Sequence, residues 1–212
     1  MALEAPPIPT LWESDGVWAV AKPAGLATLP ERDPARPSLW ARLRAQRPGP
    51  LYLVHRLDKD TSGVLLLATT PAAHRHLANL FRLRRVDKRY LAWVRGPVRP
   101  EAGTIDAPLR LFGSGRVAVD PRGRPARTDF RVLERRGDAT LLELRPCTGR
   151  RHQLRAHLYH LGHPIVGDPL YGPRTPAPRL YLHAWRLGWP DPAERWREVE
   201  APPDELFRAG PP

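Results

Sequence analysis

Apolar residues are arranged along the chain in short runs and in segments with helical spacing, separated by stretches rich in Gly, Pro and charge. Continuous apolar runs bounded by Gly or polar residues are typical of buried strands. Such runs occupy residues 17–21, 51–54 and 64–68, and residues 180–187, which include His183 and Arg186, predict a last strand. Residues 128–133 and 140–144 instead alternate apolar and polar positions on either side of Arg135–Asp138, which predicts an antiparallel hairpin.

Two helices are predicted in the first half of the chain. Ser38 can cap a short helix in which Leu39 and Leu43 lie four residues apart. Thr70 can cap a second helix with Pro71 at its first position, where the missing N–H of proline is tolerated. The expected core face of this second helix consists of Ala73, Leu77, Leu80 and Phe81.

A third helix is predicted after Gly149. Leu154, Leu158 and Leu161 follow at i, i+4 and i+7, and Gly162 ends the segment. This interpretation places Arg150 and His152 in the first helical turn, where backbone N–H groups attract phosphate.

The ends and one internal stretch lack clear periodicity. Residues 1–12 are rich in Pro and are interpreted as an extended arm, and residues 201–212 as a flexible tail. Residues 97–126 are rich in Gly, Pro and Arg, with short strands expected near 104–105 and 117–119. Residues 13–200 are therefore expected to form one folded domain.

Composition indicates a polyanionic partner. The chain of 212 residues has 34 Lys and Arg, only three of them Lys, against 22 Asp and Glu, and its formal net charge is +12 at pH 7. Arg is suited to forked contacts with phosphate, so nucleic acid is the first candidate and an anionic membrane the second. A source that favours Arg and Pro for other reasons, such as heat adaptation, would give the same composition.

The sequence features that bear on cellular location predict a cytoplasmic protein. A single cysteine, Cys147, allows no internal disulfide and favours a reducing compartment. No apolar run approaches the roughly 20 residues of a membrane span, and the first residues do not resemble a signal peptide. We expect a soluble cytoplasmic monomer that does not bind membranes.

The segment HRLDKDTSGVLLLA, from His55 to Ala68, joins a charged loop directly to a predicted core strand. The loop carries Asp58 and Asp60 among cations. A solvated turn with surface ion pairs is one interpretation. A catalytic group presented on a loop that a rigid strand supports is the other.

This segment resembles the catalytic motif of the RluA family of RNA pseudouridine synthases. Three further segments are similar to that family: the strand that ends in K-P-x-G at Lys22, the K-x-Y-x-A-x-V-x-G pattern from Lys88, and T-G-R-x-H-Q-L-R-x-H followed by G-x-P-I-x-G-D-x-x-Y-G. The resemblance covers residues 13–184. The chain looks like a short form of the family without an N-terminal accessory RNA-binding domain.

The resemblance implies the site residues. It makes Asp58 the essential carboxylate, Tyr90 a residue that lies against the target base, and Arg155 the basic partner of Asp58. Arg56 would enter the space that the flipped base vacates, and Leu154 would line the base pocket. The remaining candidates for RNA binding are His55, Lys22 (for which a loop-positioning role is the alternative), Lys88, Arg150 and His152.

The chemistry explains why these residue types suit the reaction. Pseudouridine formation breaks a glycosidic C–N bond and rejoins the uracil through carbon, so no redox cofactor is needed. A buried carboxylate stays ionised when an arginine offsets its desolvation, which is the reason to pair Asp58 with Arg155. A stacked uridine must first be flipped out. Attack on the ribose and proton removal both remain open as the role of Asp58.

The implied fold is the pseudouridine-synthase fold, an α+β architecture with a mixed, largely antiparallel sheet, flanking helices and a central active-site cleft. The implied partner is structured RNA, tRNA or rRNA. No metal site is expected, because His152, His157, His160 and His163 have no Cys or second cluster to complete one. A non-catalytic RNA-binding module or RNA chaperone on the same fold remains an alternative, as does a DNA or nucleotide glycosidase.

Overall fold

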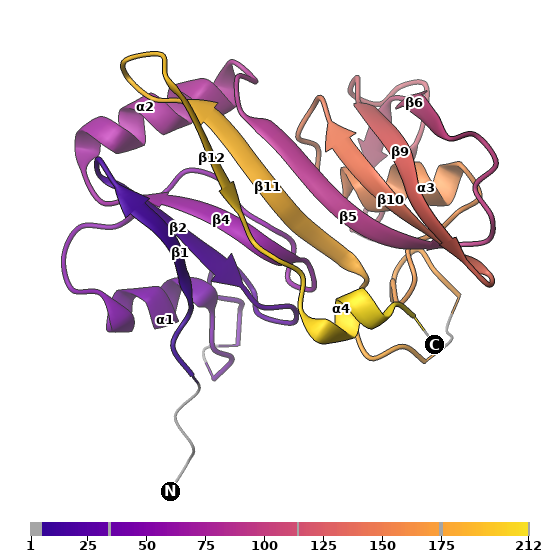
Figure 1. Ribbon diagram of the computed structural model, residues 1–212, viewed down its shortest axis with the longest axis horizontal. Coiled ribbons are helices and arrows are strands. Elements are labelled where there is room, and N and C mark those ends of the chain that lie inside the picture. The colour runs from indigo at the N-terminus through magenta and orange to yellow at the C-terminus, as the bar shows by residue number, and fades with distance from the viewer. Residues whose placement is uncertain (1–5, 34, 114, 174–175, 212) are drawn as a thin grey trace, which may run out of the picture. The chain divides into compact units, whose positions relative to one another are not determined.

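The chain forms two compact units in the computed structural model, which describes residues 6–33, 35–113, 115–173 and 176–211 (Figure 1). Unit 1 consists of Met1–Val86 and Arg186–Ala201, and unit 2 of Asp87–Trp185 and Pro202–Pro212. The strand β11 (Leu182–Pro190) begins in unit 2 and ends in unit 1. Each unit has its own hydrophobic core, so the two are described in turn.

Unit 1 is built on the strand β4 (Ser62–Ala68), in which all seven residues are buried. The antiparallel neighbour β2 (Val17–Lys22) pairs with it along its length, and β3 (Tyr52–Leu53) pairs with its last two residues. The strand β1 (Thr10–Ser14) pairs with β2, and β12 (Trp196–Glu200) pairs with the end of β11. Burial on both faces explains the continuous apolar sequence of β4.

The two helices of unit 1 begin at the caps that the sequence predicts. In α1 (Leu39–Gln46) the Ser38 hydroxyl accepts a hydrogen bond from the N–H of Ala41, and in α2 (Pro71–Arg82) Thr70 accepts one from Ala73, both at 3.2 Å. Each cap satisfies an N–H group that has no partner within its helix. The predicted apolar face of α2 contributes to the core of unit 1.

Unit 2 contains four antiparallel strands in the order β5-β10-β9-β6. Their bounds are Asp87–Arg95 for β5, Ala102–Asp106 for β6, Arg127–Arg136 for β9 and Ala139–Pro146 for β10. The predicted hairpin is confirmed, with its turn at residues 137–138. A small second hairpin pairs β7 (Leu109–Leu111) with β8 (Val117–Val119).

The helix α3 (Gln153–His160) is almost entirely enclosed, because residues 153–158 are all buried. It begins later than the sequence pattern indicates: His152 is the residue before its first turn and has a left-handed backbone, with φ of 50°. The expectation that Arg150 and His152 lie in the first helical turn is therefore wrong. Gly162 follows the end of the helix with φ of +86°, as expected for a helix stop.

The C-terminal segment is not the flexible tail that its composition predicts. Residues 205–209 form the helix α4 (Glu205–Ala209), and Asp204 caps it by accepting a hydrogen bond from the Phe207 N–H at 2.8 Å. The Phe207 side chain is 1% exposed within the core of unit 2, and its carbonyl accepts a hydrogen bond from the Trp93 indole at 3.1 Å. One apolar anchor among polar and Pro residues is enough to fix this segment.

The N-terminal arm is also shorter than predicted. The backbone N–H and C=O of Ile8 both bond to the side-chain amide of Gln46 at 2.9 Å, and Ile8 itself is buried. The strand β1 then begins at Thr10. Residues 1–5 of the predicted arm lie outside the described part of the chain.

None of the helices in the described residues is long and apolar enough to cross a membrane.

Phe207→Ala should lower the free energy of unfolding by about 3–5 kcal/mol, because it empties a filled core site. The neighbouring substitution Leu206→Ala is the control, since Leu206 is 46% exposed and its loss should change stability by no more than ~0.5 kcal/mol. Urea denaturation followed by circular dichroism measures both. Equal, small effects would mean that the C-terminal segment does not contribute to the core.

Candidate functional site

The candidate residues divide between the two units. Lys22, His55, Arg56 and Asp58 belong to unit 1, whereas Lys88, Tyr90, Arg150, His152, Leu154 and Arg155 belong to unit 2. Each unit therefore holds its own set of candidate residues, and each set is described with the backbone and side chains of its own unit.

Asp58 lies half-buried at the start of a tight turn whose backbone is held at three successive carbonyl groups. The carbonyl of Leu57 accepts a hydrogen bond from the Thr28 hydroxyl at 2.8 Å, and that of Lys59 accepts one from the Lys22 ammonium at 2.8 Å. Between them, the carbonyl of Asp58 accepts one from the Thr61 N–H at 3.2 Å. The main chain on both sides of the carboxylate is thus fixed.

Lys22 supports this turn from inside the fold. Its side chain is 1% exposed, and its ammonium also donates to the Pro23 carbonyl at 2.9 Å. A buried ammonium requires such acceptors, because removing it from water without them is very unfavourable. Of the two roles considered for Lys22, this placement favours loop positioning over direct contact with an RNA phosphate.

The other residues of the loop differ in exposure. Leu57 is buried and Arg56 is exposed. The ring of His55 stacks on Phe81 with centroids 4.6 Å apart, and its Nε2 accepts a hydrogen bond from the Leu66 N–H at 2.9 Å. His55 thereby continues the hydrogen bonding of β4 beyond the end of β3, which is a structural role. The exposed position of Arg56 suits a residue that acts on RNA.

In unit 2, alternation along β5 separates Lys88 and Tyr90 from Asp87 and Arg89. The Lys88 ammonium donates to the Thr148 carbonyl at 3.2 Å, at the start of the T-G-R segment. Tyr90 is half-buried and packs against the core of unit 2. These contacts place both residues on the face of β5 that the sequence motif predicts.

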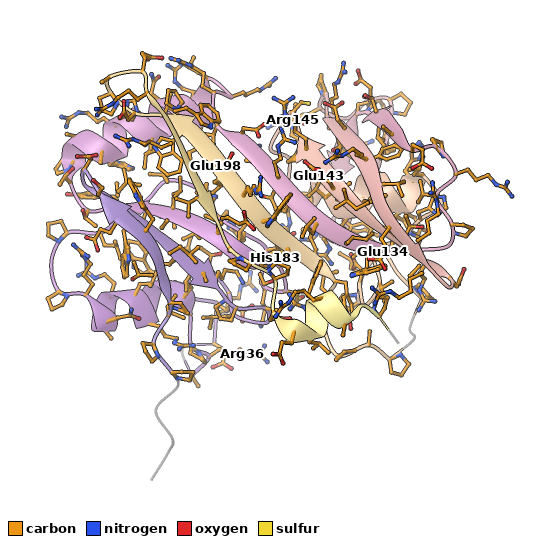
Figure 2. All side chains as sticks on the ribbon, in the orientation of Figure 1. Arg36, Glu134, Glu143, Arg145, His183 and Glu198 are labelled. Carbon is orange, nitrogen blue, oxygen red and sulfur yellow. The ribbon has the colours of Figure 1, made fainter. Side chains whose placement is uncertain are left out.

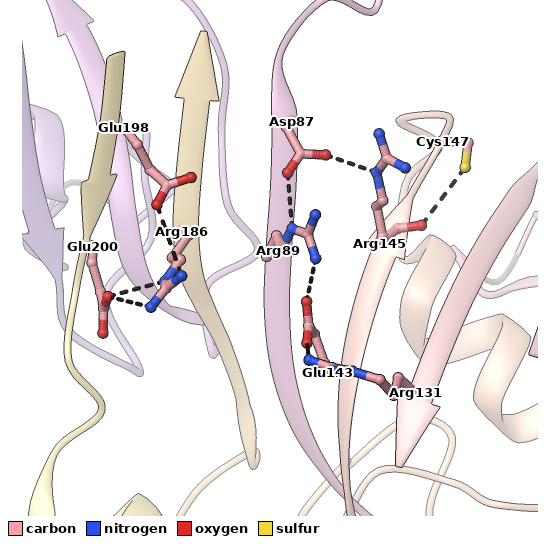
Figure 3. Close-up of polar contacts among 9 residues, drawn as sticks. All are labelled: Asp87, Arg89, Arg131, Glu143, Arg145, Cys147, Arg186, Glu198 and Glu200. Atoms are coloured by element: carbon pink, nitrogen blue, oxygen red, sulfur yellow. Dashed lines mark hydrogen bonds and ion pairs between the residues drawn. The ribbon is translucent and has the colours of Figure 1, made fainter. Parts of the chain in front are cut away.

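The opposite face of β5 carries a chain of ion pairs (Figure 3). Arg89 bridges Asp87 at 2.9 Å and Glu143 at 2.5 Å, while Arg145 binds Asp87 and Arg131 binds Glu143. Burial acts to raise the pKa of Glu143 and of Asp87, but the arginines outweigh it and hold both pKa values below their ordinary range. The network is therefore ionised at neutral pH.

Gln153 organises the T-G-R-R-H segment. Its Oε1 accepts hydrogen bonds from the Thr148 hydroxyl at 2.6 Å and the Arg150 N–H at 3.0 Å. Its Nε2 donates to the Arg127 carbonyl at 2.9 Å and the Thr128 hydroxyl at 3.0 Å. The buried amide thus fixes the backbone that carries Arg150.

Two histidines of this region have structural partners. His157 is fully buried; its Nε2 donates to the Ala107 carbonyl and its Nδ1 accepts from the Thr128 hydroxyl, both at 2.9 Å. Burial lowers the pKa of His157, which keeps the ring neutral. His152 contacts the Tyr171 hydroxyl at 3.1 Å. Among the described residues no three His, Cys, Asp or Glu side chains are gathered in a way that would hold a metal ion.

Arg155 has a carboxylate partner that the sequence interpretation missed. Its guanidinium forms a forked ion pair with Asp168, with Nε–Oδ2 at 2.7 Å and Nη2–Oδ1 at 2.8 Å. Arg155 is 5% exposed, and the neighbouring Leu154 is also buried. The pairing of Arg155 with Asp58 stays a prediction. Asp168 belongs to the G-D-x-x-Y-G motif, but the sequence carries no signal that pairs it with Arg155.

Comparison with known proteins decides the family. The family model described as RNA pseudouridylate synthase matches residues 16–160, which include Asp58, Tyr90 and Arg155. The chain belongs to the RNA pseudouridine synthase family. The RluA family resemblance is thereby confirmed.

Relatives agree with this assignment. The chain is 41% identical over 191 residues to the dual-specificity RNA pseudouridine synthase RluA of Escherichia coli K12, covering 86% of this chain and 87% of that protein. It is 46% identical over 197 residues to an uncharacterized RNA pseudouridine synthase of Chloroflexus aurantiacus, covering 85% of this chain but only 61% of the relative. Two further curated relatives are matched over 58% and 64% of their lengths.

Among solved structures, human RNA Pseudouridylate Synthase Domain Containing 1 is similar with a TM-score of 0.80 and 34% identity, over 92% of this chain and 83% of that one. The α+β pseudouridine synthase fold is therefore confirmed, and in both units the described strand ladders are antiparallel.

Lys22→Met should lower stability by about 1–3 kcal/mol, because it leaves the carbonyls of Pro23 and Lys59 without their donor. It should leave unchanged the slope of log binding constant against log salt concentration for RNA. Loss of one phosphate contact would instead make that slope less steep by about 0.9. Thermal unfolding and RNA titrations at several salt concentrations measure the two effects. Lys59→Met, at a half-exposed lysine of the same loop, is the control for stability. A reduced slope with unchanged stability would restore the phosphate-binding role.

Proposed function

We propose that this protein isomerises uridine in structured RNA, tRNA or rRNA, to pseudouridine. The observation that carries the proposal is the match of residues 16–160 to the RNA pseudouridylate synthase family, because this range includes both the Asp58 turn and the whole of α3. The geometry of unit 1 supports it, since a half-buried carboxylate is held on a backbone fixed at three successive carbonyls.

Asp58 acts on the ribose side of the target nucleotide. The bond between the ribose carbon C1′ and the uracil nitrogen N1 breaks, the uracil turns, and its carbon C5 joins C1′, while the proton on C5 is released and N1 takes up a proton. No electrons or groups are gained or lost overall, so the balance requires no cofactor. A carboxylate on a rigid loop serves this step either as nucleophile or as base.

Arg155 and Tyr90 support the step from unit 2. The buried guanidinium of Arg155 is held by Asp168, so its hydrogen bonds are donated in a fixed direction. Tyr90 stacks on the flipped base, where its hydroxyl relays the proton that leaves C5. The buried Leu154 next to Arg155 provides an apolar wall for the base.

RNA binding draws on the charge of the chain. The exposed Arg56 enters the space that the flipped uridine leaves, which lowers the energy required for flipping. The net charge of +12, almost all from arginine, holds phosphates without reading sequence.

Asp58→Asn should abolish tritium release from RNA labelled at uridine C5 while RNA binding persists, because the amide keeps the shape and removes the anion. Asp60→Asn is the matched control: it makes the same change two residues later in the same turn, and its rate should stay within about threefold of wild type. Analysis of the product as pseudouridine, and not free uracil, separates this function from a glycosidase. Substantial tritium release by the Asp58→Asn variant would show that Asp58 has no part in the mechanism. If the wild-type protein binds RNA but releases no tritium, the alternative of a non-catalytic RNA-binding module is favoured.

A short stem-loop from tRNA or rRNA should be a sufficient substrate for the purified 212-residue chain, because its arginines contact backbone phosphates and a flippable base, not a long sequence. Stem-loop, whole tRNA and assembled ribosomal subunits are offered in parallel at several salt concentrations. Affinity should fall steeply with salt as counterions are released. Modification of assembled particles alone would contradict this prediction.

A further inference from the structure

The Asp168 carboxylate is completely enclosed and fully bonded. Its side chain is 0% exposed. Besides the two bonds from Arg155, its Oδ1 accepts hydrogen bonds from the N–H groups of Leu170 at 2.9 Å and Tyr171 at 3.0 Å. Bonds from its own loop fix the carboxylate independently of the arginine that it binds.

The two glycines of the G-D-x-x-Y-G segment allow this loop to form. A Cβ on Gly167 would lie 1.8 Å from the Arg179 carbonyl oxygen, and the residue has φ of +73°. A Cβ on Gly172 would lie 2.8 Å from the carbonyl oxygen of Asp168. Only glycine therefore permits the close backbone approaches that close the loop around the carboxylate.

Tyr171, from the same loop, covers one face of the guanidinium. The Cζ atom of Arg155 lies 5.2 Å from the centre of the Tyr171 ring. The ring is itself fixed, because its hydroxyl accepts a hydrogen bond from the Val117 N–H at 2.9 Å and contacts His152. Burial raises the pKa of Tyr171, so the ring stays neutral beside the arginine.

One loop thus sets both the direction and the plane of the guanidinium. Asp168 engages the edge formed by Nε and Nη2, and Tyr171 packs on the face. Two of the five N–H donors of the group bond to Asp168, and this clamp also determines the directions of the other three.

We propose that Asp168 is a positioning residue for pseudouridine formation. It fixes the orientation of the Arg155 guanidinium, which supports the step assigned to Asp58, and Tyr171 assists it. The inference rests on the proposed function of the chain, because the step that it supports is the one assigned to Asp58. Asp168 touches neither the RNA nor the reacting atoms.

The competing explanation is that this ion pair only ties α3 to its neighbouring loop. Unit 2 offers a matched comparison, because Glu143 on β10 is also nearly enclosed and binds two arginines (Figures 2 and 3). Glu143 joins β5, β10 and β9 on the face opposite Tyr90, so it contributes to stability without positioning a candidate catalytic group.

Asp168→Asn is the test, since the amide keeps the shape and can still accept from Leu170 and Tyr171 while the charge is lost. Glu143→Gln is the control. We expect the single-turnover rate of tritium release at saturating RNA to fall by about 100-fold in Asp168→Asn, with the Kd for RNA within about threefold. Glu143→Gln should lower the Tm and keep the rate. All rates are measured well below the lowest Tm.

A double-mutant cycle with Arg155→Lys shows whether Asp168 acts through Arg155. Residues that act as one unit are non-additive, so adding Asp168→Asn to Arg155→Lys should slow the reaction by less than about threefold more. Effects that multiply, or an Asp168→Asn rate equal to wild type, would overturn the inference while leaving the proposed function intact. An inactive wild type would overturn both.

If Asp168→Asn does not fold, Asp168→Glu replaces it in the same comparison. That variant keeps the charge and shifts the carboxylate by one methylene, so it should lose rate and retain RNA affinity. An unchanged rate would likewise overturn the positioning role.

Discussion

The Asp58 turn depends on the hydrogen bonds that the buried ammonium of Lys22 donates to backbone carbonyls. Lys22 lies at the end of β2, and β2 pairs with β4 so that Lys22 is opposite Gly63, immediately after the turn. A shift of one residue in this pairing would send the ammonium to the other face of the strand. The register that buries the apolar residues of β2 and β4 is thus the same register that fixes the carbonyl of Lys59 and, with it, the backbone of Asp58.

Unit 2 uses the same principle, but its supporting group is a buried anion, the carboxylate of Asp168. The buried cation Arg155 is held by Asp168, and the turn that precedes α3 is held by the buried amide of Gln153. Buried polar groups are tolerated only when they are fully bonded, and such networks are rigid for that reason. The buried polar groups Lys22, Gln153 and Asp168 thus each hold the backbone or side chain of a candidate site residue.

The sequence predicted what short-range rules control and missed what depends on distant contacts. Caps at Ser38 and Thr70, and the apolar run of β4, follow from local chemistry. The strand β12 and the helix α4 each bury a single large apolar residue, Val199 or Phe207, which leaves no periodic pattern to detect. Among the site residues, Asp58, Tyr90 and Arg155 came from family resemblance, whereas Asp168 becomes visible only once its loop is folded.

The anchors of each functional residue lie within one unit. Thr28, Lys22 and Thr61, which hold the Asp58 turn, are all in unit 1, and Asp168, Tyr171 and Gln153, which hold Arg155 and the turn before it, are all in unit 2. The contacts that fix the Asp58 turn and the contacts that fix Arg155 therefore belong to separate hydrophobic cores. The backbone on both sides of Asp58 and the guanidinium of Arg155 are each held by residues of their own unit, and such rigid supports are what a preorganised site requires.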